Sequence, residues 1–250
     1  MASSNSLTVP PSPAFVAAFS RAAGPARTLR FDAFMALALY DPQVGYYRAD
    51  RLRVGRDRSA DFYTATSLGP LFGELVCAAA SKLLVDSGLD PAAHTFVEIG
   101  AEPSGGILAG VASHPFAATR TLRVGEPLAL AGPCVVFSNE LFDAQPVRRF
   151  IRRATAWHEL GVTLAPDSAP RNAGCQPAPS PPSEPPQPPT LLETDLGPVT
   201  PSDADILAHL PPFAITPEGY RFDAPLAAAA LARDLAAQPW HGLFIAFDYG

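Results

Sequence analysis

The chain has 250 residues, of which 48% are hydrophobic and 17% are charged, which is enough to bury the core of one sizeable domain and excludes a chain that is disordered throughout. Its 18 basic and 24 acidic residues give a formal net charge of −6, which argues against a nucleic-acid-binding surface because such a surface needs clustered lysine and arginine. The sequence has no run of about 18 apolar residues, so we expect no insertion into a membrane.

The N-terminal part is predicted to be helical. Residues 1–13 carry no basic charge and are expected to form a disordered leader, not a transit peptide. Apolar residues then recur every three to four positions, which predicts helices over 13–23, 31–39 and 71–84. Between the last two, the basic segment 48–58 is expected to be an exposed loop. We assign residues 14–91 to an N-terminal helical region.

Continuous apolar blocks in the rest of the chain are typical of strands that are buried on both faces. Residues 95–100 form such a block and run into small residues, after which helical character resumes at 105–109. Two later blocks, 133–138 and 243–247, are separated by an alanine-rich helical pattern over 224–237. Strands that alternate with helices predict an α/β fold with a mostly parallel, doubly wound sheet.

Proline is concentrated in one segment. Ten prolines lie between Pro166 and Pro189, interleaved with polar residues, so this stretch cannot bury enough apolar surface to fold. We interpret residues 166–190 as a disordered insert; a ligand for a proline-recognising module is the alternative. The insert separates a first part of the core, 92–165, from its remainder, 191–250, which includes a short helix near 203–210.

The cysteines indicate a reducing compartment and offer no metal site. Cys77, Cys134 and Cys175 form no CxxC pair and leave one cysteine over in any disulfide scheme. Among the basic residues only Lys82 is a lysine, and alanine is abundant, which suggests GC-rich coding. We therefore expect a cytoplasmic, bacterial protein.

Two blocks carry candidate chemistry. The first places Glu98 at a strand end before small residues, a turn in which backbone NH groups can approach a cofactor beside a helix N-terminus; a tight turn without a ligand is an equal alternative. The second places Asn139, Glu140 and Asp143 after a buried strand, at the end where ligands bind in open parallel sheets. An N-cap with a solvated loop is the alternative for this second block.

Several segments resemble the MidA-like family. These are FMALALYDPQVGYY (34–47), DFYTATSLGPLFGEL (61–75), FVEIGA (96–101), SNELFDAQPVRRF (138–150), WHE (157–159) and FDYG (247–250). They occur in the family's order and cover most of the chain outside the insert. The family consists of class I methyltransferases that use S-adenosyl-L-methionine, serve the assembly of respiratory complex I in mitochondria and have bacterial relatives.

The resemblance implies a Rossmann-like methyltransferase sheet and methylation of an arginine on a protein partner, such as a subunit of complex I. It implies catalytic roles for Asn139, Glu140 and Asp143, where a carboxylate can pair with a guanidinium and orient its nitrogen. The residues that it implies for binding S-adenosyl-L-methionine are Glu98, Gly100, Ala101, Gly105, Glu126, Tyr46 and Thr64. For the tyrosine and the threonine, an aromatic core with a capped turn is an equal alternative.

The sequence departs from the family in three places. Its cofactor loop has a carboxylate and a proline, Glu102 and Pro103, where the family has a glycine-rich turn. Glu126 is the candidate acid for the ribose hydroxyls, yet only eight residues separate it from Val135, too few for a further helix and strand. The chain also stops directly after a core strand, so we expect a truncated or incomplete sheet.

These departures leave two hypotheses, and a third is weaker. The leading one is a MidA-like methyltransferase. The second is a catalytically degenerate relative that serves as a protein-binding or assembly module. A nucleotide-dependent dehydrogenase is disfavoured because the GxGxxG spacing is absent.

Overall fold

The computed structural model describes residues 10–47, 68–101, 105–165, 189–200 and 204–248. They form two compact units. The first unit is drawn from Met1–Arg48 and Pro146–Leu226, and the second from Ala49–Gln145 and Ala227–Gly250. The expected leader, basic loop and proline-rich insert fall largely outside the described residues.

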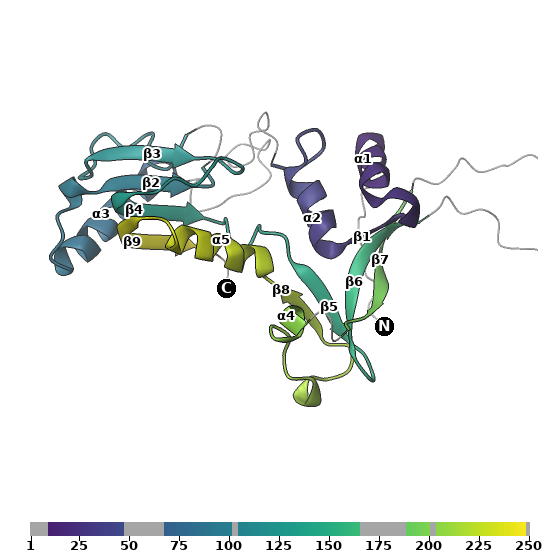
Figure 1. Cartoon of the computed structure of the whole chain (residues 1–250). Coiled ribbons are helices and arrows are strands. Elements are labelled where there is room, and N and C mark those ends of the chain that lie inside the picture. The colour runs from purple at the N-terminus through teal and green to yellow at the C-terminus, as the bar shows by residue number, and fades with distance from the viewer. Residues whose placement is uncertain (1–9, 48–67, 102–104, 166–188, 201–203, 249–250) are drawn as a thin grey trace, which may run out of the picture. The chain divides into compact units, whose positions relative to one another are not determined.

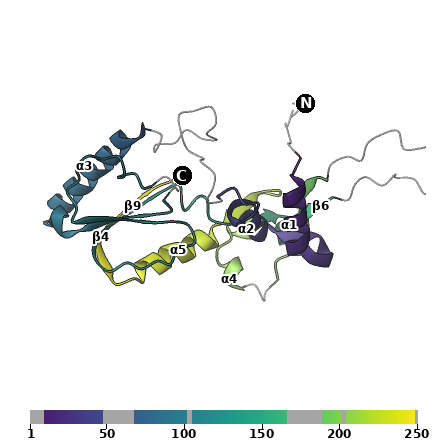
Figure 2. The same ribbon diagram turned by 90° about the horizontal axis from the view of Figure 1, so that it is seen from above.

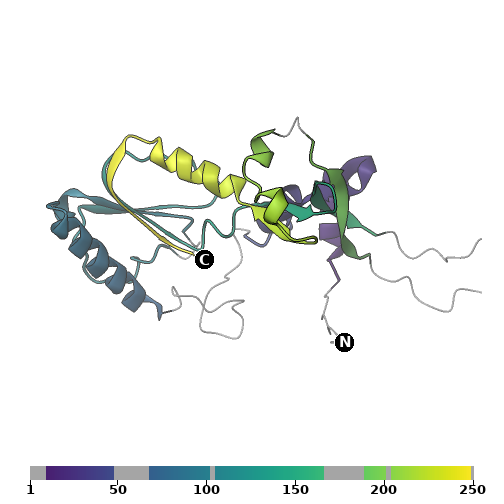
Figure 3. The ribbon, with the colours of Figure 1, turned by 90° about the horizontal axis from the view of Figure 1, so that it is seen from below.

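The second unit is built on a four-stranded parallel sheet (Figure 1). Its strand order is β3-β2-β4-β9, and each neighbouring pair is parallel. The bounds are β2 Thr95–Ile99, β3 Ala118–Leu122, β4 Gly132–Asn139 and β9 Trp240–Phe247. The helices α3 (Pro70–Asp86) and α5 (Leu226–Ala236) lie on opposite faces of this sheet (Figures 2 and 3). The predicted doubly wound α/β fold is therefore confirmed.

Apolar side chains on both faces of the central strands hold these layers together. On the α3 face, Phe96 and Phe137 pack with Phe72 and its neighbours on the helix. On the other face, Val97 and Val136 belong to a cluster that includes Leu235 of α5. Because side chains alternate along a strand, the continuous apolar runs seen in the sequence supply both clusters at once.

Two connections in this unit lack a helix. The sequence predicted a helix from Gly105, but residues 107–110 form only turns and no helix occurs in the described stretch 105–117. The reason is local: Gly105, Gly106 and Gly110 lie within six positions, and glycine is costly in a helix interior. The connection from β3 to β4, residues 123–131, is also irregular, as the short spacing after Glu126 predicted.

The first unit contains an antiparallel sheet that the sequence did not predict (Figure 1). Its order is β1-β6-β5-β8, with β7 paired to β6. The strands are β1 Thr28–Arg30, β5 Arg148–Arg152, β6 Trp157–Leu164, β7 Leu191–Pro198 and β8 Arg221–Ala224. Residues 146–165 and 191–223, which were expected in the parallel core, instead contribute β5 to β8 to this antiparallel sheet.

The helices of the first unit match the predicted positions. They are α1 Pro13–Ala23, α2 Phe31–Tyr40 and the short α4 Ala204–Leu207. The α1 helix starts at a Ser12 N-cap, whose hydroxyl accepts a hydrogen bond from the Phe15 NH at 3.2 Å. Phe19 of α1 packs with Val162 and Leu164 of β6, so this helix contributes to the core of the unit.

Arg148 and Glu159 form a largely buried ion pair between β5 and β6. Nε and Nη2 of the arginine donate to the two carboxylate oxygens at 2.7 and 2.6 Å, and each side chain is 15% exposed. This bidentate geometry offsets the cost of removing both charges from water.

The remaining expectations concern cysteines and membranes. Cys77 and Cys134 are buried and free, and burial raises the pKa of both thiols. Cys175 lies outside the described residues. Within the described ranges, no helix combines the length and apolar character needed to cross a bilayer.

The Arg148–Glu159 pair yields a stability test. Arg148→Met should lower the free energy of unfolding of the first unit by about 3–5 kcal/mol, because the carboxylate is left without its partner. The double variant Arg148→Met/Glu159→Leu should recover most of this loss. Urea unfolding followed by Trp157 fluorescence, in a Trp240→Phe background, measures both. A single variant as stable as the parent would contradict the assignment.

Candidate active site

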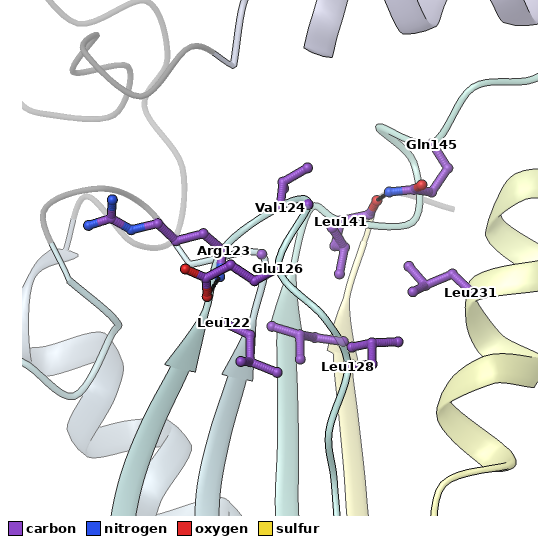
Figure 4. A pocket seen from close by; sticks show the side chains of 11 residues that line it. Leu122, Arg123, Val124, Glu126, Leu128, Leu141, Gln145 and Leu231 are labelled. Atoms are coloured by element: carbon purple, nitrogen blue, oxygen red, sulfur yellow. Dashed lines mark hydrogen bonds between the residues drawn. The ribbon is translucent and has the colours of Figure 1, made fainter. Parts of the chain in front are cut away.

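The carboxyl ends of the parallel strands meet at one edge of the sheet in the second unit, and a cavity opens there (Figure 4). Its volume is about 130 Å³. Its walls come from the ends of β2 and β3, the loops after β3 and β4, and helix α5. The lining residues are Ile99, Gly100, Leu122, Arg123, Val124, Gly125, Glu126, Leu128, Leu141, Gln145 and Leu231.

This cavity has an apolar floor and a rim that is partly polar. Figure 4 shows Leu122 and Leu128 lower in the cavity, with Val124 and Gln145 higher, on the connecting loops. A nucleoside suits such a lining, because its flat base can lie against the leucines and a carboxylate can accept hydrogen bonds from its ribose hydroxyl groups.

Glu126 is held in place by the turn that carries it. Its Oε2 accepts a hydrogen bond from the Arg123 NH at 3.0 Å, and its own NH donates to the Arg123 carbonyl at 3.1 Å. The side chain is exposed at the mouth of the cavity. The structure thus brings the candidate ribose-binding acid to the same cavity as Gly100.

Gly100 allows the chain to turn sharply after β2. Its φ is +76°, in the left-handed region, and a Cβ there would lie 2.9 Å from Cδ1 of Leu141. The next residue, Ala101, is buried, and its NH donates to the Leu122 carbonyl at 3.1 Å, which extends the pairing of β2 with β3. Gly100 therefore lines the cavity, whereas Ala101 supports it from behind.

Glu98 organises the following loop and does not line the cavity. It is 7% exposed, and its Oε2 accepts a hydrogen bond from the Ile107 NH at 2.6 Å. A Cβ at Gly106 would collide with this oxygen, so the glycine permits the approach. Glu98 and Gly105 line a separate cavity of about 230 Å³, together with Phe96. Strand alternation places Glu98 and Phe96 on the face opposite Ile99.

The second block forms the end of β4 and the loop after it. Asn139 is the last residue of β4 and pairs with Phe247 of β9. Glu140 follows with a φ of 49°, unusual for a residue with a side chain, and its NH donates to the Phe247 carbonyl at 2.7 Å. Such backbone strain persists only where surrounding contacts impose it, and it clusters at functional sites.

Asp143 lies beside a carboxylate that the sequence analysis did not select, Asp248. Oδ1 of Asp248 accepts hydrogen bonds from the Phe142 and Asp143 NH groups at 3.1 and 3.2 Å. Burial raises the pKa of Asp143, and the nearby charge of Asp248 raises it further. The sequence does contain one indication of Asp248: this residue directly follows the apolar run of β9, just as Asn139 ends the apolar run of β4.

The remaining predicted residues belong to the other unit or lie outside the described residues. Tyr46 belongs to the first unit, where its ring contacts Tyr47 edge-on at 5.2 Å and Tyr47 stacks on Tyr40 at 5.4 Å. Thr64 lies outside the described residues. Among the described residues, no group of three His, Cys, Asp or Glu side chains could hold a metal ion.

Comparison with known proteins identifies the family. Residues 120–250, slightly more than half of the chain, match a family model described as "Putative S-adenosyl-L-methionine-dependent methyltransferase". The chain belongs to this methyltransferase family. The family's cofactor is S-adenosyl-L-methionine. No curated protein matches the chain.

Two solved structures from Burkholderia thailandensis are similar to this chain. One is described as a "likely methyl transferase" bound to S-adenosyl-homocysteine; it is 25% identical, with a TM-score of 0.65, and the match covers 98% of this chain and 66% of that one. The other, an uncharacterized protein of the same superfamily, is 24% identical with a TM-score of 0.61, covering 98% and 65%. The chain thus spans just under two thirds of either length.

The chemistry of the cavity lining is compatible with the adenosine half of the cofactor. Glu126 offers a carboxylate for the ribose hydroxyls, the leucines offer a surface for the adenine, and Gly100 lets the backbone come close. The described stretch 105–117 supplies no helix N-terminus that could bind the methionine half of the cofactor. The Glu98–Ile107 hydrogen bond joins the end of β2 to residue 107, beyond the loop.

The role of Glu98 can be tested with two variants. Glu98→Ala should weaken binding of S-adenosyl-L-methionine by about tenfold or more, because a buried charged hydrogen bond of roughly 1.5–3 kcal/mol that shapes the loop is lost. Glu98→Gln keeps an oxygen that can accept from the Ile107 NH and should bind several-fold better than the alanine variant. Isothermal titration measures both; equal affinities would argue against this role.

Glu126 should contribute directly to cofactor affinity. Glu126→Gln should weaken binding about tenfold, because a charged acceptor for the ribose hydroxyls becomes neutral. Glu74→Gln, on the exposed side of α3, is the matched control and should leave the affinity unchanged. Titration with S-adenosyl-L-methionine tests this pair, and an unaffected Glu126→Gln would place the ribose elsewhere.

Proposed function

We propose that this methyltransferase is of the MidA-like type and methylates an arginine of a protein partner, a subunit of respiratory complex I, in the bacterial cytoplasm. The observation that carries the proposal is the set of acidic and amide side chains after β4 and β9. Asn139, Glu140, Asp143 and Asp248 all lie at the strand edge that also holds the cofactor cavity. Leu141, within the same block, is part of the cavity wall.

The chemistry of this edge suits a guanidinium group. Guanidinium is a planar cation that a carboxylate can bind with two parallel hydrogen bonds, and this fixes the direction of its nitrogen. S-adenosyl-L-methionine, when bound, supplies a methyl group on a sulfonium sulfur. Glu140 holds the guanidinium, and the Asn139 amide oxygen can accept from one of its NH groups.

Methyl transfer also requires the removal of a proton. A guanidinium that received the methyl group would lose one proton from the methylated nitrogen, so the site would need a group that accepts this proton. Asp143 is suited to take this proton because burial and then the charge of Asp248 raise its pKa. The proton passes from Asp143 to water.

The catalytically degenerate relative is the alternative, and one observation favours it. Residues 105–117 supply no helix beside the cofactor cavity, and a chain that no longer binds the cofactor does not need one. Titration with S-adenosyl-L-methionine separates the two functions. The methyltransferase gives a saturable heat signal, and a folded protein without one acts as a binding module.

The acceptor block can be tested separately from the cofactor cavity. Asn139→Ala and Glu140→Ala should retain affinity for S-adenosyl-L-methionine and lower methyl transfer to arginine by about a hundredfold, because positioning of the acceptor is lost. The measurement uses cofactor with a labelled methyl group and the complex I subunits of the same organism, followed by mapping of the modified residue. Glu74→Ala serves as the control.

Two outcomes would contradict the proposal. Methylation confined to lysine, with arginine unmodified, would reject a guanidinium acceptor. If both variants lose cofactor binding as well as methyl transfer, the block is structural and does not contact an acceptor.

A further inference from the structure

Asp248 connects two segments that are about a hundred residues apart in the chain. It directly follows β9, and its Oδ1 accepts hydrogen bonds from the Phe142 and Asp143 NH groups of the loop after β4. A third bond runs nearby, from the Glu140 NH to the Phe247 carbonyl at 2.7 Å. The loop over residues 140–143 is therefore fastened to the end of β9 at three NH groups.

This fastening explains how the loop keeps an unfavourable conformation. Glu140 has a left-handed φ of 49°, which costs free energy for a residue with a Cβ. The parallel pairing of β4 with β9 holds Asn139 on one side of it, and Asp248 holds Phe142 and Asp143 on the other. Without the Asp248 carboxylate, the NH groups of Phe142 and Asp143 lose this hydrogen-bond acceptor.

We propose that Asp248 is a positioning residue for the arginine acceptor: its carboxylate fixes loop 140–143 so that Glu140 and Asp143 together meet the guanidinium. This inference rests on the proposed function. Asp248 acts through the loop, by its two hydrogen bonds to backbone NH groups, and also places a second negative charge beside Asp143.

The second charge gives the acceptor site a predictable pH dependence. Burial raises the pKa of Asp143, and Asp248 is the only charged group among the described residues that shifts it. Below its raised pKa Asp143 carries a proton, and above it the Asp143 carboxylate is charged. A guanidinium prefers the charged carboxylate, so the KM for the acceptor should fall as pH rises through the pKa of Asp143.

Two substitutions separate the hydrogen bonds from the charge. Asp248→Asn keeps an oxygen that can accept from Phe142 and Asp143 but removes the charge. It should keep kcat within about threefold and move the pH midpoint of the acceptor KM downward, because the charge that raised the pKa of Asp143 is gone. Asp248→Ala removes both functions and should raise the acceptor KM at least tenfold at every pH.

The measurement is steady-state methyl transfer to an arginine acceptor between about pH 5 and 9, with cofactor affinity determined by titration for each variant. Unchanged affinity for S-adenosyl-L-methionine shows that the variants fold. Asp90→Ala is a matched control, because Asp90 accepts from the Ala92 NH at 2.9 Å just ahead of β2, at the other end of the sheet. It should leave the acceptor KM unchanged.

The outcomes distinguish this inference from the proposed function. If the parent protein binds the cofactor but methylates no arginine, the proposed function fails. If it methylates arginine and Asp248→Ala keeps the parental KM, only the positioning role fails. The role also fails if Asp248→Asn is as impaired as Asp248→Ala, or if the pH midpoint stays where it was.

Discussion

The parallel pairing of β4 with β2 on one side and β9 on the other is the constraint on which the second unit depends. Parallel strands place all their carboxyl ends at one edge, so the residues that follow each strand become neighbours whatever their separation in sequence. This pairing brings Gly100, Asn139 and Asp248 to that edge. The pairing is stable because β4 is apolar on both faces, with Phe137 packed under α3 and Val136 in the cluster that includes Leu235 of α5.

The parallel sheet could be predicted from the sequence because its signal is local. The blocks around Phe96 and Val135 are apolar without interruption, and that pattern belongs to strands covered on both sides. The antiparallel sheet carries no such signal. The strands β5 and β7 contain charged residues such as Arg149 and Glu193 beside apolar ones, and the stabilising partners of these charges come from other strands, as in the ion pair of Arg149 with Asp223 of β8.

Part of the candidate site could likewise be predicted from the sequence, and part of it could not. Glu126 and Gly100 could be selected because each follows a strand, and the structure places both on one cavity. The task of Glu98, which accepts from the Ile107 NH, depends on how the loop folds back, and the sequence does not encode this in a short motif. The proximity of Asp248 and Asp143 could not be predicted for a similar reason, because it exists only once β9 has paired with β4.

The same pairing has a consequence for how the protein is made. Strand β4 is synthesised about a hundred residues before β9, and at typical elongation rates of roughly 5–20 residues per second that interval lasts several seconds. During this time the first unit can begin to form, whereas β4 has only β2 as a neighbour in its sheet. This edge of the sheet therefore assembles late, through contacts of high sequence separation, and a nascent chain exposes the hydrogen-bonding edge of β4 with which β9 will pair. Transiently unpaired strand edges of this kind favour association between unfinished chains.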